Sequence, residues 1–594
     1  GNLEIAWRWY TTNHGPQPEF NYEATPLMVD GVLYTTAGRR RDVVAIDPVT
    51  GEDLWMFRFD EGSRRGPRVN SGRGLSLYRN DEVSRLIVIT PGFQMLSIDA
   101  STGKLDPAFG STGVVDLRDN LDERFEIDKE NEPVGNTSPA MIVGDVIVVG
   151  ATFPSGGSPP SKEGVAGNIR GYDARSGQLL WTFHTIPQGT EFGTESWQDG
   201  SNAYTGAAGA WSTMSADLER GIVYVPVEAA TGDMYGGHRP GNNLFSQTLV
   251  ALDAKTGKRL WHYQLVHHDV WDYDPPTGPV LADLKVDGKV IPAAIQVSKQ
   301  GMIYTFNRVT GEPVWPIVET PVPQNGVPGE HLSPTQPIPS RPKAFERQGL
   351  TEDDLIDFTP ELKAEALRLV QGYTWGPLFT PPSIVDDKNG GTIFLPGFGG
   401  GANWQGVAFD PDTNMLYIPS TSHPMKVGLG KDPRNRGGFD YAMTSRGIVM
   451  EGPFGLPLIK PPYGRITAVD MNSGDHQWMM ANADTPAEIR DNPYLKGVEL
   501  PRTGTGDRGA LLVTKTLLFA GEGAGLYGGQ TGGGRMFRAH DKATGEILAQ
   551  IELPAKQTGL PMTYAIDGVQ YIVVPVGDTG HPGELVALRV KQDR

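Results

Sequence analysis

The densest group of chemically reactive side chains in this sequence lies in residues 267–276, which read His-His-Asp-Val-Trp-Asp-Tyr-Asp-Pro-Pro. The stretch follows a strand-like segment, 260–266, and in an extended chain Asp272 and Asp274 would project to the same side. Two carboxylates held close together repel each other unless a cation or a shared proton relieves them. The stretch is therefore either a cation-binding or acid–base site or, more simply, a solvated acidic turn ended by the two prolines.

The composition of the chain excludes several classes of function. The 594 residues carry a formal net charge of -18, which argues against nucleic acid or an anionic membrane surface as a partner. No segment approaches the roughly 18 uninterrupted apolar residues of a membrane span. Cysteine is absent, which excludes disulfides, thiolate nucleophiles, Cys-ligated zinc, iron–sulfur clusters and covalently bound c-type haem. No signal peptide begins at Gly1, so a leader either was never present or has been removed.

One short phrase recurs along the chain: an apolar strand, Asp or Asn, two or three residues, Thr/Ser-Gly, and often a Trp soon afterwards. The acidic side chain can cap a turn and the Gly can adopt a positive φ, so each copy predicts a turn between two strands. Seven clear copies and one weaker cousin place the capping residue at Asp47, Asp99, Asp173, Asp253, Asn307, Asp470 and Asp541, and at Asp410.

These copies predict an all-β fold, an eight-bladed β-propeller that forms a single domain over residues 1–594. Their spacing, mostly about 50 to 80 residues, is that of multi-stranded blades, which close radially and hide their edges. A string of independent β domains is disfavoured because no linker-like boundary separates the copies. A Pro-rich insert at about 319–396, with a helical piece at 359–369, is expected to project from one face.

The repeat and the acidic stretch together resemble the quinoprotein dehydrogenases, eight-bladed propellers that bind pyrroloquinoline quinone (PQQ) and a divalent metal ion. The resemblance runs from Glu23 to Tyr571 and is nearest to the branch that contains the membrane-bound glucose dehydrogenase. It rests on several motifs in the family's order, among them Trp211 with Tyr-Val-Pro at 224–226, Gly-Gly-His-Arg at 236–239, the stretch 267–274, Lys299-Gln-Gly-Met-Ile-Tyr and Pro-Met-Thr-Tyr at 561–564.

The resemblance implies a set of cofactor-binding residues, which are Glu23, Arg73, Thr137, Trp211, Lys299 and Asn403. In the family pattern Arg73 pairs with a PQQ carboxylate, Trp211 stacks on the planar quinone, and Lys299 faces the reactive quinone oxygens. Taken singly, Arg73 is equally an ordinary salt-bridge arginine and Trp211 a packing residue between blades. The alcohol dehydrogenase branches carry adjacent cysteines beneath PQQ where this chain has residues 67–68, which leaves the second stacking face open.

The resemblance also implies the metal ligands Glu163, Asn243 and Asp272. Asp274 lies where lanthanide-dependent alcohol dehydrogenases carry an additional aspartate. Oxygen ligands without cysteine or imidazole suit Ca²⁺ or Mg²⁺. Because the glucose-type branch also has an acid at this place, Ca²⁺ is the first expectation, with a lanthanide or Mg²⁺ as alternatives. The register around Glu163 contains one inserted residue relative to the glucose type, and as a loop acid Glu163 has a purely structural reading too.

The implied reaction is the oxidation of an alcohol by hydride transfer to PQQ, with the metal as Lewis acid, Asp272 as general base and Lys299 stabilising charge on the quinone. Secondary alcohols, polyols, sugars and bulky hydroxylated compounds such as trichothecenes are candidate substrates. A cytochrome c or a quinone would accept the electrons, in the periplasm. The alternative is a non-catalytic propeller scaffold of the outer-membrane assembly type, which has no reason to hold the 267–274 stretch, Lys299 and Trp211 together.

Overall fold

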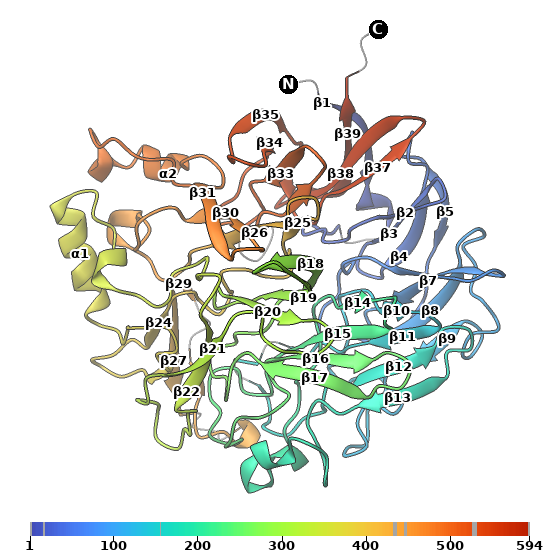
Figure 1. Cartoon of the computed structure of the whole chain (residues 1–594), viewed down its shortest axis with the longest axis horizontal. Helices are drawn as coiled ribbons and strands as arrows, with labels where there is room; N and C mark the ends of the chain where they lie inside the picture. Colours follow the sequence, from blue (N-terminus) through green and yellow to red (C-terminus); the bar gives the residue numbers. More distant parts are fainter. Residues whose placement is uncertain are drawn as a thin grey trace.

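Nearly all regular structure in this protein is β-sheet, and its sheets follow one another along the chain (Figure 1). The computed structural model describes residues 3–15, 18–154, 156–157, 159–431, 436–444, 448–525 and 532–591. Within these ranges eight antiparallel sheets form the blades, six of them four-stranded, one three-stranded and one five-stranded. None of the helices in the described ranges is long and apolar enough to cross a bilayer.

Blades 1 to 4 are four-stranded and occupy the first half of the chain. In chain order they contain β2 (Leu27–Val29), β3 (Val32–Ala37), β4 (Asp42–Ile46) and β5 (Asp53–Phe57); β6 (Ser76–Arg79), β7 (Ser84–Ile89), β8 (Gln94–Asp99) and β9 (Val114–Asp116); β10 (Met141–Val143), β11 (Val146–Val149), β12 (Ile169–Asp173) and β13 (Leu179–Phe183); and β14 (Ser215–Asp217), β15 (Ile222–Val227), β16 (Thr248–Asp253) and β17 (Arg259–Gln264).

Blades 5 to 8 complete the set, and blade 8 takes one strand from the start of the chain. They contain β18 (Val280–Val286), β19 (Lys289–Val297) and β20 (Ile303–Asn307); β25 (Ala408–Asp410), β26 (Met415–Thr421), β30 (Gly464–Asp470) and β31 (Asp475–Ala481); β32 (Leu511–Val513), β33 (Leu517–Gly521), β34 (Met536–Asp541) and β35 (Ile547–Glu552); and β36 (Lys556–Gln557), β37 (Met562–Ile566), β38 (Val569–Asp578), β39 (His581–Val590) and β1 (Leu3–Tyr10).

Pairing between the two ends of the chain closes the ring. Strand β1 runs antiparallel to β39, from Leu3 opposite Val590 to Tyr10 opposite Glu584. The two strands lie side by side in Figure 1, where the blue start of the chain meets its red end. A closed ring leaves only short, protected sheet edges, which is the usual solution for a large all-β chain. The predicted eight-bladed propeller is thereby confirmed.

The recurring phrase forms the turn after the third strand of blades 1 to 7. In the first copy the Asp47 carboxylate accepts hydrogen bonds of 2.8 Å from the N–H groups of Val49 and Thr50, and Gly51 has a φ of 77°. The weaker copy at Asp410 forms the turn between the first two strands of blade 6. The clear copy at 470–474 forms the turn after the third strand of the same blade. The number of blades was therefore predicted correctly, but the eighth comes from pairing of the chain ends.

Tryptophans that follow the recurring phrase join neighbouring blades. Trp261 of blade 4 packs on Gly311 of blade 5, where a Cβ atom would lie 2.7 Å from the indole. Its Nε1 donates a hydrogen bond of 3.0 Å to the carbonyl of Arg308. Trp181 packs on Gly257 of the next blade in the same way, and its Nε1 donates to Ala254. The glycine thus meets two demands, a positive φ and close approach of a ring.

The remaining elements belong to inserts between or within blades. Thr359 caps α1 by accepting a hydrogen bond from the N–H of Leu362, so the helix predicted at 359–369 is confirmed within one residue. The other elements form two small sheets and short helices: α1 (Pro360–Val370), α2 (Ala487–Arg490), β21 (Ile317–Pro321), β22 (Thr335–Pro339), β23 (Ser383–Ile384), β24 (Thr392–Phe394), β27 (Met425–Gly430), β28 (Ala442–Met443), β29 (Ile448–Val449), and the 3-10 turns η1 (Thr11–Asn13), η2 (Thr194–Ser196), η3 (Gln198–Ala203), η4 (Glu352–Asp354), η5 (Arg436–Gly438), η6 (Pro453–Gly455) and η7 (Pro493–Leu495).

Glu19 is a buried carboxylate at the junction of the connections that precede blades 1 and 2. Its Oε1 accepts hydrogen bonds from the N–H of Ser71 at 3.0 Å and from its hydroxyl at 2.9 Å. Its Oε2 has no hydrogen-bond partner among the described residues. Burial raises the pKa of Glu19 from an ordinary value of 4.5 to about 7. The folded protein therefore prefers Glu19 in its neutral, protonated form.

The blade junctions predict a large loss of stability for Trp261→Ala. The substitution removes a buried indole and its hydrogen bond, so we expect a loss of about 3–5 kcal/mol in the free energy of unfolding, measured by urea denaturation. Leu260→Ala is the matched control, because its side chain is 48% exposed on the same strand. Equal midpoints for the two variants would show that the indole does not join blades 4 and 5.

Burial of Glu19 predicts that Glu19→Gln increases the free energy of unfolding by an amount that depends on pH. Because the folded pKa of about 7 lies above the unfolded value near 4.5, the stability that Glu19 contributes is complete below pH 4.5 and is lost as pH rises through 7. The amide cannot ionise, so the variant should gain up to about 3 kcal/mol over the wild type between pH 5 and 8. The exposed Glu52→Gln should show no such trend. A stability difference between Glu19→Gln and the wild type that stays constant with pH would contradict the raised pKa of Glu19.

Candidate active site

A cavity of about 990 Å³ brings together eight of the ten predicted site residues. The residues on its wall are Glu23, Arg73, Glu163, Trp211, Asp272, Asp274, Lys299 and Asn403. Each of them comes from a loop, either between the second and third strands of a blade or between one blade and the next. In an up-and-down sheet these two kinds of connection lie at the same end of the blade. The turns of the recurring phrase lie at the other end.

Lys299 connects the two aspartates of the acidic stretch. Its Nζ lies 2.8 Å from Asp272 Oδ1 and 2.8 Å from Asp274 Oδ2. Asp274 also accepts hydrogen bonds from the N–H of Ala229 at 2.9 Å and from Nε1 of Trp211 at 3.2 Å. Asp272 has a φ of 57°, so the two carboxylates converge through a left-handed residue and not along an extended strand. A solvated acidic turn is excluded, since Asp274 is buried.

The remaining polar residues of the stretch hold its backbone in place. The buried Asp269 carboxylate accepts hydrogen bonds from Nε2 of Gln247 at 2.8 Å and from the N–H of Asp272 at 3.0 Å. His268 is buried, and its Nε2 lies 2.8 Å from Glu330 of the insert. These contacts explain how a left-handed aspartate is held in one position, so the chemistry of the stretch belongs to Asp272 and Asp274.

The electrostatics of the site are dominated by buried negative charge. Burial raises the pKa of Asp272 well above its usual range, with repulsion from Asp274 and Asp233 adding to it and attraction by Lys299 opposing it. Burial also acts on Asp274, but the charge of Lys299 and the hydrogen bonds that the Asp274 carboxylate accepts together outweigh it and hold that pKa below its usual value. Burial raises the pKa of Glu228 well above normal, and burial together with Asp274 raises that of Asp233 to about 7. Lys299 is thus the cation placed among four carboxylates.

Asp233 is a site residue that the sequence analysis missed. It lines the cavity, and its Oδ2 accepts a hydrogen bond of 2.8 Å from the N–H of Gly156. It lies in the connection between the second and third strands of blade 4, as Lys299 does in blade 5. The local sequence, Thr-Gly-Asp, looks like an ordinary turn and gives no sign of a site residue. The position of Asp233 in the blade, which matches that of Lys299, is the signal that could have identified it.

Two predicted residues do not line the cavity. Asn243 is fully buried elsewhere in the same connection as Asp233, where its Oδ1 accepts a hydrogen bond of 2.7 Å from Arg239 and its Nδ2 donates one of 2.8 Å to the Arg239 carbonyl. With both ends of its amide bonded to Arg239, this placement does not support the prediction of Asn243 as a metal ligand. Thr137 accepts a hydrogen bond of 3.0 Å from Nη1 of Arg73, and so positions that arginine.

Arg73 lies between two tryptophans on the cavity wall. Its guanidinium carbon is 5.3 Å from the ring centroid of Trp211 and 4.7 Å from that of Trp404. Its Nε lies 3.3 Å from Glu23 Oε2. Arg68 and Arg508 line the same cavity. Trp404 thus adds a second aromatic face near Trp211.

Two further predicted residues lie at the edge of the site. Glu163 is exposed, with its backbone N–H bonded to the Ser161 hydroxyl at 2.9 Å. Asn403 donates a hydrogen bond of 2.8 Å to the Gly399 carbonyl and accepts one from the N–H of Trp404. Both side chains face the cavity, but the amide of Asn403 also fixes its own loop. Among the described residues no three His, Asp or Glu side chains already converge as a complete metal site.

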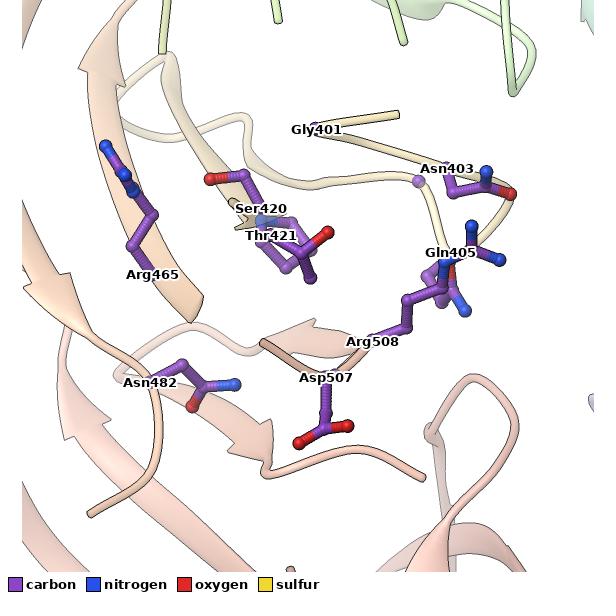
Figure 2. A pocket seen from close by; sticks show the side chains of 12 residues that line it. Gly401, Asn403, Gln405, Ser420, Thr421, Arg465, Asn482, Asp507 and Arg508 are labelled. Carbon is purple, nitrogen blue, oxygen red and sulfur yellow. The ribbon is translucent and has the colours of Figure 1, made fainter. Parts of the chain in front are cut away.

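A small side pocket of about 10 Å³ shares Asn403, Gln405 and Arg508 with the cavity (Figure 2). Figure 2 shows these three side chains gathered on one side, with Arg465 on the opposite side and Asp507 below them. Its volume is enough for about one water molecule. The side pocket can therefore hold solvent next to the site, and it is too small for an organic ligand.

Comparisons with known proteins show the family of this chain. A family model described as "PQQ: Glucose/ethanol/alcohol dehydrogenase, beta-propeller domain" matches residues 1–572. The glycerol dehydrogenase large subunit of Gluconobacter oxydans (strain 621H) is 31% identical over 98% of this chain and 79% of its own length. The quinoprotein glucose dehydrogenase of Escherichia coli (strain K12) is 29% identical over 98% of this chain and 74% of its own length.

A solved structure has the same fold. The europium-containing methanol dehydrogenase matches 99% of this chain and 93% of its own chain, with a TM-score of 0.67 and 20% sequence identity. The resemblance inferred from the motifs is thereby confirmed, and the scaffold alternative is set aside. The chain belongs to the family of PQQ-dependent glucose, ethanol and alcohol dehydrogenases with a β-propeller domain, and it is an oxidoreductase that acts on CH–OH groups.

Proposed function

We propose that this enzyme oxidises an alcohol at the cavity with PQQ as cofactor, a divalent metal ion beside it, and Asp272 as the general base. The observation that carries the proposal is the ion triad of Lys299 with Asp272 and Asp274 on the wall of a cavity of about 990 Å³. That volume is at the upper end of the roughly 300–1,000 Å³ found for ligand pockets. It has room for both a cofactor and a substrate.

The residues of the cavity fit a planar tricarboxylic quinone. Arg68, Arg73 and Arg508 provide guanidinium groups, whose planar forks suit carboxylates. Trp211 provides a flat aromatic face, and Lys299 Nζ lies 5.9 Å from the centroid of that ring. We therefore assign PQQ to the space between the arginines and Lys299, with Trp211 as its stacking partner.

The residues also fit a hard divalent cation, for which Ca²⁺ is the first choice. Asp233, Asp272, Asp274 and Glu228 provide carboxylate oxygens around Lys299, and carboxylates are the ligands that Ca²⁺ prefers. Burial and, after it, repulsion between the carboxylates raise the pKa of Asp233 and Asp272, and two added positive charges would favour the ionised form of both. We propose Asp233 and Asp272 as the principal ligands, with Glu163 at the edge. Europium in the methanol dehydrogenase keeps a lanthanide as the alternative.

The chemistry of the chain's own residues is proton transfer and positioning. Bound PQQ supplies the two-electron acceptor and the metal ion supplies Lewis-acid polarisation. Asp272 takes the proton of the substrate hydroxyl, because its carboxylate lies on the cavity wall where a positioned general base is needed. Lys299 holds Asp272 in place, and Asp274 fixes Lys299 and Trp211 from the other side.

The proposal includes an external electron acceptor and a periplasmic location. The cysteine-free chain has no covalent haem attachment site, which favours a separate cytochrome c or a quinone as acceptor. The glycerol and glucose named for the two relatives are candidate substrates, together with secondary and bulkier alcohols.

Activity should depend on both PQQ and a divalent metal. We expect exhaustive chelation to abolish phenazine-mediated dye reduction, and PQQ with Ca²⁺ to restore it. Metal content, measured by mass spectrometry, should fall at least tenfold in Asp233→Asn, because a carboxylate ligand is lost. Glu163→Gln, on the exposed edge, should lose less. Activity that survives removal of PQQ and metal would overturn the proposal. Full metal content in Asp233→Asn would show that Asp233 is not a metal ligand.

Replacing the proposed base should separate chemistry from binding. Asp272→Asn keeps the size of the side chain and an oxygen for the metal but cannot accept the substrate's proton. We expect kcat to fall by about two to four orders of magnitude while PQQ still binds. In Asp274→Ala a modest loss is expected with Ca²⁺, whereas loss of metal content together with activity would indicate a lanthanide. Near-normal turnover of Asp272→Asn would show that another group takes the proton.

A further inference from the structure

A bridge between two distant blades crosses the end of the propeller that carries the site. One side consists of residues 153–154, 156–157 and 159–165, in the connection between the second and third strands of blade 3. The other is the segment 436–444, inserted between the second and third strands of blade 6. The N–H of Met443 donates to the Gly157 carbonyl at 3.1 Å, and the N–H of Lys162 donates to the Gly437 carbonyl at 2.7 Å. Because blades 4 and 5 lie between blades 3 and 6, the bridge spans the blades that carry Asp233, Asp272 and Lys299.

Aromatic packing fixes the bridge on blade 4. Phe439 meets His238 edge to face at 4.8 Å between ring centroids, and Tyr441 meets Tyr235 in the same way at 5.5 Å. Phe439, Tyr441 and Tyr235 are buried in one hydrophobic cluster. The bridge is therefore a packed part of the fold, and the side chains that it turns toward the cavity are held in place.

Besides its tryptophans, the cavity lining includes four large apolar side chains, which we call the apolar wall: Phe153, Met234, Phe398 and Met443. Phe153 and Met443 come from the two sides of the bridge, Met234 from the loop beneath it, and Phe398 from the connection before blade 6. Gly157 allows Met443 to lie close, since a Cβ there would be 2.5 Å from its Cε. Phe153, Phe398 and Met443 remain partly exposed, so their apolar surface faces the cavity.

Several polar groups of the cavity are already committed to other tasks. The arginines suit the cofactor, and the carboxylates hold Lys299 and suit the metal. Asn21 donates to Glu23 at 2.9 Å and Asn403 donates to the Gly399 carbonyl at 2.8 Å. A sugar or polyol needs hydrogen-bonding partners for several hydroxyls, and burying such hydroxyls against thioethers and phenyl rings costs free energy. An alcohol with one hydroxyl and a hydrocarbon body meets no such cost.

We propose that the substrate of this enzyme is a hydrophobic alcohol whose hydrocarbon body packs on the apolar wall, in preference to a sugar or polyol. The hydroxyl faces Asp272, and the body contacts Met443 and Phe153 of the bridge. This inference rests on the proposed function and names the substrate class of the same site. The flexible thioethers of Met234 and Met443 adapt to different apolar shapes, so aliphatic, alicyclic and aryl alcohols are all included.

The test compares the holoenzyme on 2-propanol, 2-butanol, 2-hexanol, 2-octanol, glycerol and glucose. We expect kcat/KM to rise about fourfold per added methylene, which corresponds to about 0.8 kcal/mol for each buried methylene group. Glycerol and glucose should fall at least tenfold below 2-octanol. If glycerol or glucose is oxidised as well as 2-octanol in a PQQ-dependent reaction, the substrate inference is wrong and the proposed function stands. If none of the alcohols is oxidised with PQQ and metal bound, the proposed function fails first.

Met443→Gln tests the wall itself, since it keeps the length of the side chain and adds an amide. We expect kcat/KM to fall about tenfold for 2-octanol and to stay within about twofold for 2-propanol. Calorimetry on the same holoenzyme should show about tenfold weaker binding of 2-octanone, a ketone that cannot be oxidised. Met479→Gln is the matched control, because Met479 is 51% exposed on β31 and lies away from the cavity wall. An equal loss on every alcohol, or unchanged binding of 2-octanone, would overturn the inference.

Discussion

The site depends on one interaction, the attraction between Lys299 and the carboxylates of Asp272 and Asp274. The buried Asp274 and the half-buried Asp272 are separated by one residue, and they are unstable together unless positive charge relieves them. Lys299 provides that charge at 2.8 Å from each, and it comes from a different blade connection than the aspartates. The two carboxylates therefore lie close together only in the folded propeller, where blade 5 places the lysine beside the end of blade 4.

The propeller provides this arrangement through its strand order. Each four-stranded blade directs two connections toward the same end, and the residues on the cavity wall come from such connections. The other end carries the recurring turns, in which a capping acid, a glycine and a neighbouring tryptophan join the blades. Stability and chemistry are thus separated on the two ends of the same strands, which lets the site loops hold a buried charge cluster on a rigid base.

The charged residues of the cavity and its apolar wall suit different ligands. The arginines and carboxylates are suited to a charged cofactor and a cation, and the bridge between blades 3 and 6 adds hydrocarbon surface around the place left for substrate. The arginines and carboxylates, which lie in the blade connections, are the residues suited to the cofactor and metal of the family. The substrate class that we propose is set by the bridge, which comes from inserts that need not resemble those of the glycerol and glucose dehydrogenases.

The sequence alone predicted the propeller, because turn chemistry is local: an Asp, a Gly and a Trp at fixed offsets act within one turn and its neighbour. It also predicted Asp272, Lys299, Arg73 and Trp211, which stand in distinctive motifs. The tertiary structure decided what depends on distant contacts. The eighth blade forms by pairing of the two chain ends, and the weaker copy at Asp410 lies within blade 6. Asn243 is hydrogen-bonded to Arg239, whereas Asp233 lines the cavity. A side chain's burial and charge partners come from other blades, and no local pattern records them.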